Sequence, residues 1–142
     1  EFRRVLFRSI INNLTLFEKE FNIDLNNCAL RIELIQDTNG FWNKPHLDKL
    51  DKRITIIANI DKDDDNNLGS CLYKNESGSN EKQIEWKNNS ALVFVPTEYT
   101  WHGFLSRSEA SLDDKSRQLY VVAQIDLDTK DNINNPPLKI GE

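Results

Sequence analysis

The stretch CALRIELIQ, residues 28–36, decides the fold class, because its apolar residues alternate with Arg31 and Glu33. A period of two places alternate side chains on opposite faces, which is the pattern of a β-strand. Six further short runs have similar character: RITIIANI at 53–60, LGSCLY at 68–73, QIEW at 83–86, SALVFV at 90–95, EYTWHGF at 98–104 and QLYVVAQI at 118–125. About seven or eight short strands joined by turns predict a mainly β protein, either a sandwich or a barrel.

The region before the first strand has a helical pattern. Ile10, Leu14, Phe17 and Phe21 follow one another at spacings of three and four, so we expect a short amphipathic helix that packs on the sheet. We assign residues 10–27 to this helical segment.

The remaining divisions follow from composition. Arginines cluster in residues 1–9 and the chain contains no Met, so we interpret residues 1–9 as a non-native or truncated lead. The length of 142 residues fits one domain, which we expect to span residues 28–126. Residues 127–142 include two adjacent prolines and are predicted to form a loose tail.

Charge and hydropathy argue against two classes of partner. The net charge of −5 and the lack of a basic stripe disfavour binding to a nucleic-acid backbone. No apolar run approaches the ~18 residues that a membrane-spanning helix needs. Cys28 and Cys71 lie far apart and no signal peptide is visible, so free thiols and a cytoplasmic location are the expectation.

The two histidines of the chain define the candidate site. His46 lies in the sequence PHLD, and residues two apart on an extended chain share a face, so His46 and Asp48 can reach one point. His102 lies in TWHGF, on another predicted strand. Two imidazoles and one carboxylate form the facial triad that suits non-haem Fe(II) and leaves coordination positions open. Zinc uses the same ligand types, so the sequence alone does not choose the metal.

Arg117 opens the last strong strand. A guanidinium at this position is able to clamp a dicarboxylate through a bidentate ion pair. The alternative interpretation is an exposed charge at a strand end.

Four segments together carry a family resemblance. The residues GFWNKPHLD at 40–48, LGSCLY at 68–73, FVP at 94–96 with WHGF at 101–104, and SRQ at 116–118 resemble the 2-oxoglutarate and Fe(II)-dependent oxygenases. They are most similar to the prolyl-4-hydroxylase-like branch, including small bacterial and phage members. The likeness extends over residues 28–125.

The resemblance implies a double-stranded β-helix, or jelly roll, with a short N-terminal helix. It implies that His46, Asp48 and His102 bind Fe(II) and form the catalytic centre, and that Arg117 holds 2-oxoglutarate. Dioxygen would be the other co-substrate. Such an enzyme hydroxylates its substrate, here an unknown small molecule or protein side chain, and releases succinate and carbon dioxide. Leu119 stands where many members carry a serine that also contacts 2-oxoglutarate. Thr55 and Tyr73 are the candidates for that second contact.

Two other functions are compatible with the sequence. One is a non-catalytic β-sandwich that binds carbohydrate or protein through aromatic residues such as Trp42, Tyr73 and Tyr99. The other is a cupin-like metal enzyme that does not use 2-oxoglutarate, although such proteins usually carry more histidines than this chain.

Overall fold

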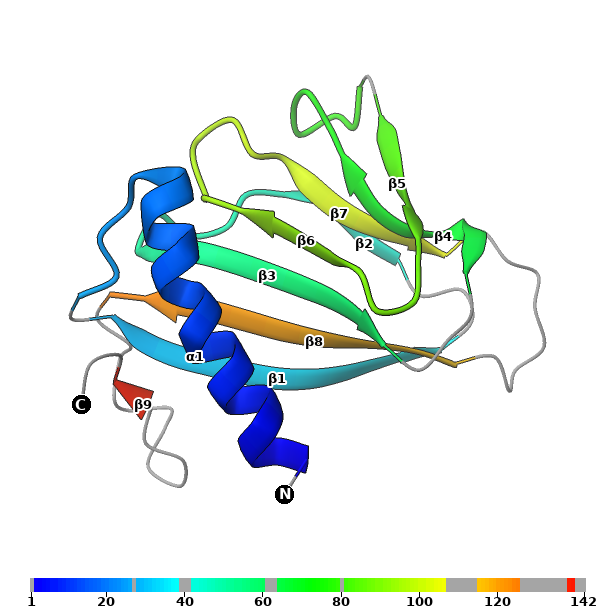
Figure 1. Cartoon of the computed structure of the whole chain (residues 1–142). Helices are drawn as coiled ribbons and strands as arrows, with labels where there is room; N and C mark the ends of the chain where they lie inside the picture. The colour runs from blue at the N-terminus through cyan, green and yellow to red at the C-terminus, as the bar shows by residue number, and fades with distance from the viewer. Residues whose placement is uncertain are drawn as a thin grey trace, which may run out of the picture.

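The computed structural model describes residues 2–26, 28–38, 42–60, 64–79, 81–106, 115–125 and 138–139 (Figure 1). In these segments one helix, α1 (Phe2–Phe21), precedes nine strands. The strands are β1 (Ala29–Thr38), β2 (Trp42–His46), β3 (Lys52–Ile60), β4 (Asp65–Leu72), β5 (Lys82–Trp86), β6 (Ala91–Phe94), β7 (His102–Ser106), β8 (Lys115–Gln124) and β9 (Leu138–Lys139).

The strands form two antiparallel sheets. One sheet has the order β6-β3-β8-β1-β9 and the other has the order β2-β7-β4-β5. Most neighbouring strands are distant in the sequence, because the chain crosses repeatedly from one sheet to the other. The prediction of a mainly β protein is therefore confirmed, and the described segments form a β-sandwich with one helix (Figure 1).

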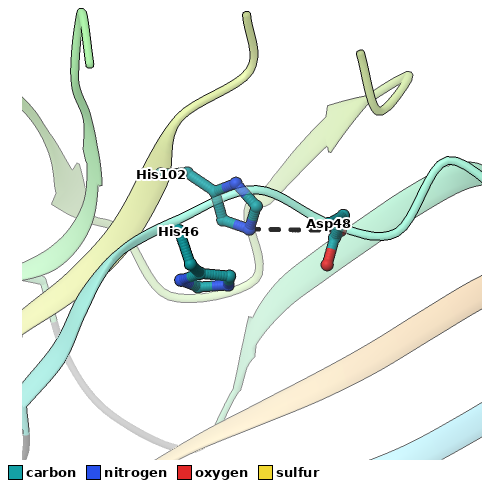
Figure 2. A group of neighbouring side chains, drawn as sticks. All are labelled: His46, Asp48 and His102. Atoms are coloured by element: carbon teal, nitrogen blue, oxygen red, sulfur yellow. Dashed lines mark ion pairs between the residues drawn. The ribbon is translucent and has the colours of Figure 1, made fainter. Parts of the chain in front are cut away.

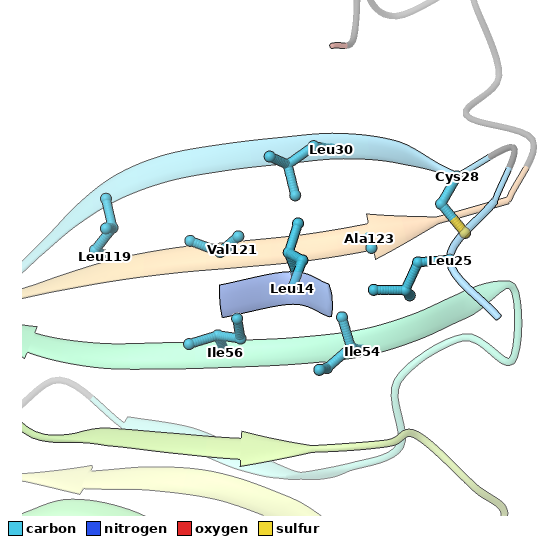
Figure 3. Packing of buried hydrophobic residues seen from close by; sticks show 9 residues of the cluster. All are labelled: Leu14, Leu25, Cys28, Leu30, Ile54, Ile56, Leu119, Val121 and Ala123. Atoms are coloured by element: carbon cyan, nitrogen blue, oxygen red, sulfur yellow. The ribbon is translucent and has the colours of Figure 1, made fainter. Parts of the chain in front are cut away.

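Helix α1 covers the outer face of the five-stranded sheet, as Figure 1 shows. Leu14 is almost fully buried and lies among apolar side chains of β1, β3 and β8 (Figure 3). The other buried members of this cluster are Leu25, Cys28, Leu30, Ile54, Ile56, Leu119, Val121 and Ala123. The expected helix is present, but it begins at Phe2 rather than at Ile10.

A second, smaller apolar cluster consists of Leu68, Trp86 and Phe104. Trp86 is fully buried and meets the ring of Phe104 edge to face, with 6.4 Å between the ring centroids. Because these three residues come from β4, β5 and β7, their contacts fasten together the sheet that carries the candidate site.

Two local features differ from the expectations. The predicted strand at 98–104 begins only at His102, because residues 97–100 form a turn in which the Thr100 N–H donates to the Thr97 carbonyl at 3.3 Å. Within the tail, β9 pairs with Ala29 and Leu30 of β1.

Among the described residues, no helix is long and apolar enough to cross a membrane.

Candidate metal centre

The pairing of β2 with β7 brings the two histidines together. His46 is the direct cross-strand partner of His102, and their ring centroids lie 4.3 Å apart. Asp48 follows two residues after His46, beyond the end of β2. One ligand atom from each of these three side chains lies within 4.8 Å of the others, so the three predicted ligands do converge (Figure 2).

A bulge in β2 shapes this approach. The register between β2 and β7 shifts between Asn43 and His46, and Pro45 lies inside the shifted segment. Proline has no N–H to donate to a ladder, so it favours such an irregularity. Gly103 faces the bulge, and a Cβ atom there would collide with the Asn43 carbonyl oxygen. The glycine after His102 therefore allows the bulged strand to lie against β7.

Both imidazoles are oriented in the same way. The Nδ1 atom of His46 lies 2.9 Å from the Lys44 carbonyl oxygen, and Nδ1 of His102 lies 2.9 Å from the Thr100 carbonyl oxygen. A carbonyl can only accept, so each Nδ1 carries the proton and donates it. This tautomer leaves the Nε2 lone pair of each ring available to a metal ion.

Two donors on β3 hold the carboxylate of Asp48. The Thr55 hydroxyl donates to Oδ2 at 2.8 Å, and the Lys52 ammonium donates to Oδ1. Oδ2 also lies 4.0 Å from Nε2 of His102 (Figure 2). Residues three apart on a regular strand face opposite sides, but the register of β3 against β8 shifts between Lys52 and Ile54. The irregularity explains how Lys52 and Thr55 reach the same carboxylate.

The electrostatic environment favours the protonation states that bind metals. Burial of Asp48 opposes its ionisation, but the hydrogen bonds from Lys52 and Thr55 and the nearby positive charge of Lys52 together lower its pKa. Burial is the main cause that lowers the pKa of His102, and the neighbouring His46 acts in the same direction. An ionised carboxylate and a neutral imidazole are the forms that coordinate a metal ion.

A cavity of about 160 Å³ lies beside the two histidines. Four polar side chains, Asn43, Ser70, Gln118 and Tyr120, line it together with His46 and His102. The remaining lining residues are Ile35, Ile57, Gly103 and Phe104. The site therefore has room for a small ligand next to the candidate metal position.

Three residues were candidates for contact with 2-oxoglutarate: Arg117, Thr55 and Tyr73. The backbone of Arg117 lies in β8 opposite Gln36 and Ile60, whereas its side chain is outside what the structure describes. Among the described residues, neither Thr55 nor Tyr73 lines the cavity. Thr55 holds Asp48 instead, and the Tyr73 ring packs against the position of Gly103.

Sequence reasoning missed Lys52 and Tyr120. The Lys52 ammonium donates to the Tyr120 hydroxyl at 2.8 Å as well as to Asp48, and so connects the candidate ligand with a cavity-lining residue. The spacing of four residues between Asp48 and Lys52 was visible in the sequence. The irregularity in β3 that allows Lys52 to reach the carboxylate was not.

No protein-family model matches the sequence, and no curated protein matches it significantly.

Proposed function

We propose that this chain is an Fe(II)- and 2-oxoglutarate-dependent dioxygenase that hydroxylates a substrate and releases succinate and carbon dioxide. The observation that carries the proposal is the convergence of His46, Asp48 and His102, whose ligand atoms lie within 4.8 Å of one another. Two nitrogen donors and one carboxylate oxygen are the set that suits non-haem iron.

The surroundings of these residues fit a metal ion. Hydrogen bonds to backbone carbonyls hold each imidazole with Nε2 available, and Thr55 orients the carboxylate. Outer contacts of this kind fix ligand geometry in metal sites. Iron bound here would supply the activation of dioxygen, and the chain's own residues would hold the ion and leave coordination positions for co-substrates.

The proposal includes a jelly-roll topology. In support, the strands divide into the sheets β6-β3-β8-β1-β9 and β2-β7-β4-β5, with the chain passing from one sheet to the other at most connections. In such a double sheet, residues from distant parts of the sequence meet between the layers. His46, Asp48 and His102 fit that placement.

A small organic acid is the proposed co-substrate of the cavity. The cavity has a volume of about 160 Å³, which is below that of pockets for drug-sized ligands, since those begin at roughly 300 Å³. Ser70, Gln118 and Tyr120 offer hydroxyl and amide groups to a carboxylate there. The resemblance assigns the ionic contact to Arg117.

The test combines spectroscopy with turnover. Under anaerobic conditions, Fe(II) and 2-oxoglutarate should produce a metal-to-ligand charge-transfer band, and admission of air should yield succinate. His46→Ala and Asp48→Ala should abolish both signals, whereas Lys49→Ala, at an exposed neighbouring position, should retain them. Arg117→Ala should raise the 2-oxoglutarate requirement far more than the iron requirement. Full succinate formation by both ligand variants would contradict the proposal.

The exposure of Trp42 and Tyr99, at 57% and 77%, favours one other candidate function. Exposed aromatic side chains suit a carbohydrate- or protein-binding β-sandwich without catalysis. Such a module would show no charge-transfer band with Fe(II) and 2-oxoglutarate. A cupin-like enzyme would bind the metal but turn over without 2-oxoglutarate.

A further inference from the structure

Lys52 is a largely buried cation in direct contact with a candidate metal ligand. Its side chain is only 11% exposed, and its ammonium forms an ion pair with Asp48. The same ammonium donates to the Tyr120 hydroxyl at 2.8 Å and lies 5.4 Å from the centroid of that ring. These contacts keep the positive charge beside the carboxylate.

The ion pair stabilises the metal-free protein but opposes the binding of a metal ion. Asp48 is buried, and a buried carboxylate without a cationic partner is strongly destabilising. Lys52 therefore supplies the charge that a metal ion would otherwise supply. Once a metal approaches Oδ2, however, the ammonium and the metal share one carboxylate and repel each other.

We propose that Lys52 is an internal counter-ion that stabilises the metal-free site and weakens its affinity for divalent metal ions. This inference rests on the proposed metal binding by His46, Asp48 and His102. Thr55 contacts the same carboxylate but is neutral, so it orients Asp48 without competing for its charge. Lys52 thus acts as a positioning residue that keeps the site folded when empty and its metal exchangeable.

Binding of Mn(II), used as a redox-stable probe of the Fe(II) position, tests the inference directly. Mn(II) is titrated into chelator-treated protein, and free Mn(II) is measured by electron paramagnetic resonance. Lys52→Met should bind Mn(II) at least about tenfold more tightly than the wild type, because a buried like charge has been removed. Lys52→Arg keeps the charge and should stay within about threefold of the wild type.

A matched control separates local from global charge. Lys49→Met makes the same change in net charge at an exposed position three residues away. It should alter Mn(II) affinity by no more than about twofold, because exposed charges are screened by solvent and salt.

Thermal unfolding of the metal-free proteins provides the second readout. Lys52→Met should melt roughly 5 °C or more below the wild type, and saturating Mn(II) should raise its melting temperature by more than it raises that of the wild type. Adding Asp48→Asn to Lys52→Met should restore much of the metal-free stability, because neither buried charge remains. If Lys52→Met does not fold, Lys52→Gln removes the charge and keeps a hydrogen-bond donor.

The outcomes distinguish the two proposals. Tighter binding together with lower metal-free stability supports the role of Lys52. Mn(II) binding by the wild type with equal or weaker binding by the charge-removing variant overturns this inference and leaves the proposed metal site intact. Failure of the wild type to bind Mn(II) or Fe(II) overturns the proposed function, and the inference falls with it.

Discussion

The hydroxyl group of Thr55 offers the sharpest test of how the candidate ligand Asp48 is held. Thr55 is fully buried, and its Oγ1 atom donates to Oδ2 of Asp48 at 2.8 Å. Thr55→Val replaces the hydroxyl with a methyl group of nearly the same shape. The variant therefore removes one hydrogen bond and leaves almost no cavity.

The expected cost follows from the charge and burial of the acceptor. A hydrogen bond to a charged group contributes about 1.5–3 kcal/mol, so Thr55→Val should lower the free energy of unfolding of the metal-free protein by about 2 kcal/mol. Loss of an outer contact to a metal ligand typically weakens metal binding by roughly 10- to 100-fold. We expect Thr55→Val to weaken Mn(II) binding by a factor within that range.

Thr55→Ser is the matched control because it keeps the hydroxyl and loses a buried methyl group. It should cost about 1 kcal/mol of stability, as other losses of one buried methyl do, while Mn(II) affinity stays near that of the wild type. Urea unfolding and Mn(II) titration of the two variants give the comparison. Equal Mn(II) affinities for the valine and serine variants would refute the conclusion that the hydroxyl positions Asp48.

Two further predictions concern the strand pair and the buried histidine. Gly103→Ala should lower the free energy of unfolding by about 1–3 kcal/mol and weaken Mn(II) binding, because the added Cβ presses on the carbonyls of β2 beside His46. The control is Gly78→Ala, whose Cβ meets only side chains at 3.4 Å or more; it should lose stability but keep its Mn(II) affinity. Equal losses of Mn(II) affinity in the two variants would argue against the steric explanation. Burial lowers the pKa of His102 below its ordinary value of about 6.5, so the unfolded chain takes up a proton first and the free energy of unfolding of metal-free protein should fall as the pH drops through that region. Urea unfolding at several pH values should show this dependence of the free energy of unfolding on pH in the wild type and a weaker dependence in His102→Gln. An equal dependence in both proteins would mean that a group other than His102 causes it.

Much of the fold was readable from local pattern. Period-two alternation and β-branched residues located β1, β3, β6 and β8, because these signals arise from single strands. Strand order was not readable, since it depends on which distant segments pair. Nor was the pairing of β9 with β1, because two residues carry no periodic signal.

The site shows the same division between local and non-local information. His46 and Asp48 were predictable because residues two apart on an extended chain share a side, and His102 because it is the one other histidine. The contacts around them were hidden. Thr55 was one of two candidates for a contact with 2-oxoglutarate, and its hydroxyl holds Asp48, because the loop after β2 returns the carboxylate to β3.

Thr55 and Lys52 donate to the two oxygens of one carboxylate, and this shared acceptor makes their roles separable. Both hydrogen bonds stabilise ionised Asp48 in the absence of metal, so loss of either donor should destabilise the metal-free protein. Their effects on metal affinity should differ in sign, because Thr55 only orients the oxygen whereas Lys52 also repels the incoming cation. A purely structural role for both residues would lower affinity in both variants, and a purely electrostatic one would leave Thr55→Val without effect. Opposite signs require that geometry and charge act on the same carboxylate independently.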